Sequence, residues 1–79
     1  MKTTKQQLAE IKYQNACVAK VENEIEYDQM SDKERGENLS AHWALVDAMD
    51  ACWAQVVRVG LAKELSGFLP ALRQEMKAC

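Results

Sequence analysis

The sequence predicts an all-α fold, a long antiparallel helical hairpin followed by a short C-terminal helix. Apolar residues recur every three or four positions in three successive segments, which is the period of a helix that packs on one face. The chain has only three Gly and one Pro, too few for the many turns of a β-fold. Its 79 residues fit a single domain, 1–79, with a marginal core of its own.

The first helix is expected over about residues 4–29. Its seam follows the alternating 3–4 spacing of a coiled coil and includes two polar residues: Leu8, Ile11, Asn15, Val18, Glu22 and Ile25. A buried Asn15 would be satisfied in one register only, whereas an Asn15 at the solvent edge would carry no such information. Both interpretations remain open at this point.

The second helix is expected over about residues 32–65. Ser31 and Glu34 form a capping-box pattern that marks a helix start. Gly36 weakens the first turns, so that regular helix begins either directly after Ser31 or two residues after Gly36. Gly67 follows Ser66 at the other end and suits the left-handed conformation that stops a helix.

A short third helix is expected over about residues 69–78. Pro70 would lie in its first turn, where proline is tolerated. The alternative is one longer helix that is kinked at Pro70.

The second helix is too apolar for a single neighbour. Placed on a wheel, its polar residues form one narrow strip: Ser40, Asp47, Asp50, Gln55 and Arg58. The apolar remainder is roughly twice as wide as the stripe of about 100° on an ordinary surface helix. We therefore expect a homodimer, or a helical bundle of copies, with the interface residues Trp43, Val46, Trp53, Val57 and Leu61. A compact three-helix monomer is the alternative.

Charge is unevenly distributed along the chain. Residues 1–20 carry four Lys and one Glu, net +3, whereas residues 21–50 carry nine acids, one Lys and one Arg, net −7. The acidic residues gather at the expected hairpin tip: Glu22, Glu24, Glu26, Asp28, Asp32, Glu34 and Glu37. This tip is a solvated knob, a contact for the basic end of another subunit, or a docking site for a protein with a basic surface.

The sequence offers no catalytic, cofactor-binding or metal-binding pattern. His42 is the only histidine and lies on the apolar face of its helix, where a core or interface position is expected. The three cysteines, Cys17, Cys52 and Cys79, are odd in number and scattered, which favours a cytoplasmic protein over a disulfide framework. The most apolar window, residues 41–62, is too polar to cross a membrane.

These observations predict a non-enzymatic protein-interaction module, a homodimeric inhibitor or adaptor that binds an unidentified protein. Small size and acidity are typical of such proteins in phages and other mobile elements, an analogy of type only. The alternative is a helical nucleic-acid-binding regulator that uses a stripe of Lys5, Lys12 and Lys20 in a dimer. A net charge of −2 makes nucleic acid the weaker prediction.

Overall fold

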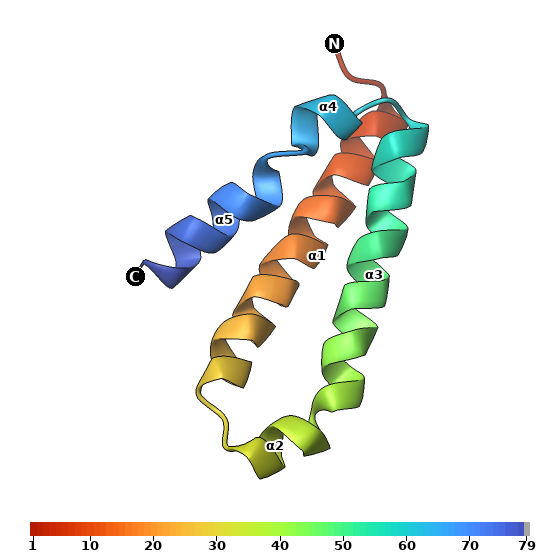
Figure 1. Ribbon diagram of the computed structural model, residues 1–79. Helices are drawn as coiled ribbons and strands as arrows, with labels where there is room; N and C mark the ends of the chain where they lie inside the picture. The colour runs from red at the N-terminus through yellow and green to blue at the C-terminus, as the bar shows by residue number, and fades with distance from the viewer. Residues whose placement is uncertain (79) are drawn as a thin grey trace.

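A computed structural model describes residues 1–78 and confirms the all-α class, with no strand in the described part. Its helices are α1 (Thr4–Asp28), α2 (Asp32–Glu37), α3 (Leu39–Arg58), α4 (Ala62–Leu65) and α5 (Phe68–Lys77). The helices α1 and α3 form an antiparallel pair joined at one end by α2, and α5 packs along α1 (Figure 1) and against the core cluster that α1 shares with α3. The molecule is elongated and thin, 47 × 26 × 16 Å.

The helix α1 begins at a capping box that the sequence analysis did not note. The Thr3 hydroxyl accepts from the Gln6 amide at 3.1 Å, and the Gln6 side chain accepts from the Thr3 amide at 3.0 Å. These bonds satisfy amides that the first turn of a helix leaves without partners. The helix ends at Asp28, one residue before its expected end.

The expected second helix is divided into three. The capping box at Ser31 and Glu34 is confirmed, but α2 lasts only six residues. Asn38 then leaves helical geometry, with φ −102° and ψ 7°, and its side-chain amide donates to the Glu34 carbonyl at 2.8 Å. Since Gly36 lowers helix propensity two residues before Asn38, the chain bends here at little cost and restarts as α3.

The other end of α3 corrects the prediction of helix as far as Leu65. The helix stops at Arg58 because Gly60 adopts φ 82°, the left-handed conformation that ends helices. The Gly60 amide donates to the Val57 carbonyl at 3.1 Å and the Leu61 amide donates to the Val56 carbonyl at 2.9 Å, the two bonds of a Schellman motif. Gly67, the expected stop, instead has φ −93° and precedes α5.

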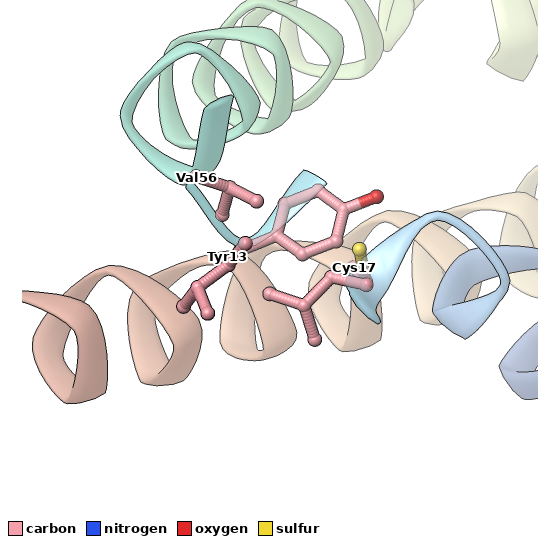
Figure 2. Close-up of a cluster of buried hydrophobic side chains, with 5 residues drawn as sticks. Tyr13, Cys17 and Val56 are labelled. Carbon is pink, nitrogen blue, oxygen red and sulfur yellow. The ribbon is translucent and has the colours of Figure 1, made fainter. Parts of the chain in front are cut away.

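The core lies where α1 meets α3 and α5. Tyr13 and Cys17 of α1 face Val56 of α3 (Figure 2), and Leu61 and Leu65 complete the buried cluster. The side chain of Tyr13 contacts rings from both neighbouring helices, with centroids 5.2 Å from Trp53 and 6.3 Å from Phe68. Burial, with a smaller contribution from the Cys17 thiol, raises the pKa of Tyr13 to about 12.

The inward face of α1 is therefore not the seam expected from the sequence. The buried residues of α1 are Ala9, Tyr13, Cys17, Lys20 and Val21. The expected seam lies on the opposite side of the helix, and we call it the α1 outer stripe: Leu8, Ile11, Asn15, Val18, Glu22 and Ile25. The prediction failed because α1 carries two stripes of helical period. The buried stripe has fewer aliphatic residues than the α1 outer stripe, but it fits the aromatic side chains of the neighbouring helices.

Candidate protein-interaction surface

One flank of α3 is apolar and only partly covered by the rest of the chain. Its large side chains follow the 3–4 spacing of a helix face, and we call them the α3 stripe: Leu39, Trp43, Val46, Trp53 and Val57. Trp43 is 55% exposed and Val57 is 51% exposed, whereas Val46 and Trp53 are half-buried. Asp50 continues the 3–4 spacing between Val46 and Trp53, and its side chain is exposed. The stripe thus presents an apolar strip with one central carboxylate.

The five residues expected at the interface differ in how far the subunit itself buries them. Leu61 is 5% exposed and belongs to the core of the subunit, so its assignment to an interface is wrong. It was misplaced because the expected helix ran through Gly60, which in fact turns Leu61 inward. Leu39 was missed, although it lies four residues before Trp43 and extends the spacing of the stripe.

The exposed indole of Trp43 contacts the ring of His42. The ring of His42 meets it edge-on, with centroids 5.6 Å apart, and stacks on Tyr27 of α1 at 5.0 Å. The Nδ1 of His42 also donates to the Oδ1 of Asn23 at 2.9 Å. The histidine therefore links α3 to the end of α1 directly beside the exposed tryptophan.

Arg35 closes the end of the hairpin. Its Nε donates to the Tyr27 carbonyl at 2.9 Å and its Nη2 donates to the Asp28 carbonyl at 3.2 Å, while its guanidinium carbon lies 5.7 Å from the centre of the Tyr27 ring. A cation at these carbonyls offsets the unfavourable arrangement of acids at the C-terminus of α1.

The acidic residues expected at the tip do not form one uniform surface. Glu24 points toward α5, where Arg73 Nε donates to its Oε1 at 2.8 Å and Lys77 Nζ lies at 3.3 Å, while Lys20 Nζ lies 3.1 Å from its Oε2. Burial alone would raise the pKa of Glu24, but the hydrogen bonds from Arg73, Lys20 and Lys77 outweigh it and hold the pKa at about 2. Glu24 is thus a structural residue that attaches α5 to α1.

The remaining acidic residues have three different surroundings. Asp28 lies 3.9 Å from Lys77, Asp32 lies 3.8 Å from Arg35, and Glu34 is held by the Ser31 cap. No ion pair forms within residues 1–78 for the exposed Glu22, Glu26 and Glu37. These three carboxylates are the ones available to a partner.

The three lysines of the expected nucleic-acid stripe are separated. Lys20 is 7% exposed and paired with Glu24, so it does not belong to an accessible basic face. Lys5 and Lys12 instead line an open groove of about 780 Å³ between α1 and α3, together with Arg58. We call it the basic groove; its apolar lining is Leu8, Ala9, Ala51, Cys52 and Val59.

The described residues contain no group of three or more His, Cys, Asp or Glu side chains placed to hold a metal ion. Within residues 1–78, no helix combines the length and the apolar character needed to cross a membrane. Cys17 is buried and free, Cys52 is half-buried and free, and Cys79 lies outside the described residues. Burial raises the pKa of the Cys17 thiol.

Comparison with known proteins identifies no relative. No protein-family model, no curated protein and no solved structure matches this chain.

Proposed function

We propose that the protein is a non-enzymatic interaction module that binds a protein partner through the α3 stripe, in the manner of a small inhibitor or adaptor. The observation that carries this proposal is the exposed indole of Trp43, in contact with His42 beside the exposed Val57 and Leu39. Tryptophan is the side chain most enriched among residues that dominate binding energy at protein interfaces.

The spacing of the α3 stripe suggests the shape of its partner. An amphipathic helix whose apolar residues repeat every three or four positions would fit along it, as helices fit grooves in other complexes. A basic residue in the middle of that helix would meet Asp50, and further basic residues would meet Glu37 at the hairpin tip. The proposed partner is therefore an apolar helix with a basic flank.

The surroundings of the polar side chains support binding rather than catalysis. The single histidine is occupied by Asn23 and Tyr27, and the Cys17 thiol lies in the core with its pKa raised. The proposal places the protein in the cytoplasm, where the free thiols of Cys17 and Cys52 remain reduced.

Site-specific crosslinking followed by affinity measurement tests the proposed function. A photoreactive amino acid at position 43 should crosslink a protein in cells that the same group at position 47, on the polar strip of α3, does not. With that protein purified, Trp43→Ala should weaken binding by about 30-fold or more, which is the effect of losing a dominant interface residue. The matched control Asp47→Ala should change the affinity by less than about threefold.

Equal crosslinking at positions 43 and 47 would contradict the proposal, as would an affinity that Trp43→Ala leaves unchanged. Circular dichroism of each variant, compared with the wild-type protein, separates a lost contact from a lost fold.

A further inference from the structure

We propose that the α1 outer stripe binds the same stripe of a second copy in antiparallel orientation, which makes the protein a two-fold symmetric homodimer. The proposal goes beyond the proposed function because it concerns a different face of the molecule. It would leave the α3 stripe of each copy free for a partner.

Four of the six residues of the α1 outer stripe are apolar, and its own chain covers them only in part. Leu8 and Ile11 are each 52% exposed, and Val18 and Ile25 are half-buried. The buried residues of α1, among them Tyr13 and Cys17, lie on the opposite side of the helix and face α3 and α5. From Leu8 to Ile25 the stripe is about 26 Å long, at the rise of 1.5 Å per residue of an α-helix. A second helix can therefore lie along it without displacing α3 or α5.

The spacing of the stripe matches itself when one copy is reversed. Antiparallel pairing about the midpoint between residues 16 and 17 sets Leu8 opposite Ile25 of the second copy. The same register sets Asn15 opposite Val18 and Ile11 opposite Glu22. In each facing pair, a residue at the first position of the heptad in one copy meets a residue at the fourth position in the other. This is the arrangement of an antiparallel coiled coil.

The charges beside the stripe also complement each other in this register. Lys5, Lys12, Glu22 and Glu26 form no ion pair within residues 1–78. Lys12 comes level with Glu22 of the second copy to within one residue, about 1.5 Å along the axis, and Lys5 comes level with Glu26 to within two, about 3 Å. The two-fold axis generates each pair twice, so all four unpaired charges of each copy gain partners of opposite sign.

A parallel dimer through the same stripe would be less favourable. Glu22 would face Glu22 in the seam, and like charges that face each other across an interface are destabilising. Antiparallel pairing also places the basic start of one α1 beside the acidic end of the other, which offsets the arrangement of charges against the helix dipole. The distribution of charge therefore selects the antiparallel orientation, which the spacing of the stripe allows.

Charge reversal with rescue tests the dimer and its orientation together. We expect sedimentation equilibrium of the wild-type protein to give a dimer at tens of micromolar. The variant K5E/K12E and the variant E22K/E26K should each raise the dissociation constant at least tenfold. The combined variant K5E/K12E/E22K/E26K should restore it to within about threefold of the wild type, because both signs are exchanged. The control E37K, an exposed acid away from the stripe, should leave it unchanged.

Three results would overturn the proposal. The first is a wild-type protein that remains monomeric at 100 micromolar. The second is a combined variant that dimerises as weakly as either double variant, because a parallel pair, in which Lys5 and Glu26 of the other copy would be about 31 Å apart along the axis, would give no rescue. The third is a dimer that Trp43→Ala abolishes and charge reversal spares, since self-association would then use the α3 stripe. Loss of partner binding by Trp43→Ala in a protein that remains dimeric would support both proposals, and each can fail alone.

Discussion

At the scale of single residues, Glu24 shows how the chain attaches its third long helix. Its side chain is only 15% exposed, and its carboxylate lies between Lys20 on α1 and Arg73 and Lys77 on α5. These cations keep it ionised far below the pH at which a free glutamate takes up a proton. Because the charged form is stabilised only in the folded protein, Glu24 couples stability to pH.

We predict that stability falls as the pH is lowered from about 4.5 to about 2, the ordinary and the folded pKa of Glu24. The unfolded chain takes up the proton first, so acid favours unfolding in this window. Such a shift corresponds to roughly 3 kcal/mol, and we expect about 2 kcal/mol because the side chains of Arg73 and Lys77 are partly exposed. Urea unfolding of Glu24→Gln should show that loss at pH 7 and little loss at pH 2.

The matched control for this prediction is Glu37→Gln, which removes an exposed acid that has no ion pair within residues 1–78 and lies outside the α1 outer stripe. It should change the free energy of unfolding by less than about 0.5 kcal/mol. If both variants had the same effect at pH 7, the ion cluster would not be what attaches α5.

At the scale of elements, Gly60 decides where the chain reverses after α3. Its φ of 82° is unfavourable for any residue with a Cβ, although a Cβ added there would meet nothing within 4 Å. The turn places Leu61 in the core beside Val56, an apolar contact that commonly accompanies this motif. The conformation of one glycine therefore directs α4 and α5 back onto α1.

We predict that Gly60→Ala destabilises the protein by about 1–2 kcal/mol, entirely through backbone strain. Gly36→Ala is the matched control, because Gly36 lies in α2 with no positive φ and no neighbour within 4 Å of an added Cβ. It should stabilise the protein by about 0.5–1 kcal/mol. Chemical denaturation of both variants measures the difference, and an equal effect of the two substitutions would show that Gly60 is not strained.

The elements also show which parts of the fold can be predicted from the sequence. Helical period and the cap at Ser31 locate three helical segments, because both depend on neighbours within a few positions. The break at Gly60 was missed since Val59 and Leu61 continue the apolar pattern through it. The inward face of α1 was also missed, because the choice between its two apolar stripes depends on how Tyr13 fits against Trp53 and Phe68, residues far away in the sequence.

For the candidate site, the sequence predicts Trp43 and Val57 at an interface, because a helix too apolar for one neighbour shows this in its composition. Both side chains are exposed in the subunit, and their place at an interface stays a prediction. It did not distinguish Glu24 and Lys20 from the other charges near them. Their pairing depends on Arg73 and Lys77, which α5 brings to them from about 50 positions away. Charge clusters in a sequence thus indicate a region, and only tertiary packing shows which members remain free.

At the scale of the whole molecule, a thin arrangement of helices leaves apolar side chains on two separate faces. The smallest dimension is 16 Å, so α3 and α5 together cover only one side of α1. The α3 stripe and the α1 outer stripe face different directions and have different charges beside them. We propose two different occupants for these two faces, a target protein for the α3 stripe and a second copy for the α1 outer stripe.

The mass of the wild-type protein in solution tests this account most directly. We predict a sedimentation mass of twice 8.9 kDa at tens of micromolar, falling toward the monomer on dilution. A mass of 8.9 kDa at every concentration up to 100 micromolar would contradict the account, because the apolar face of α1 would then remain open to water.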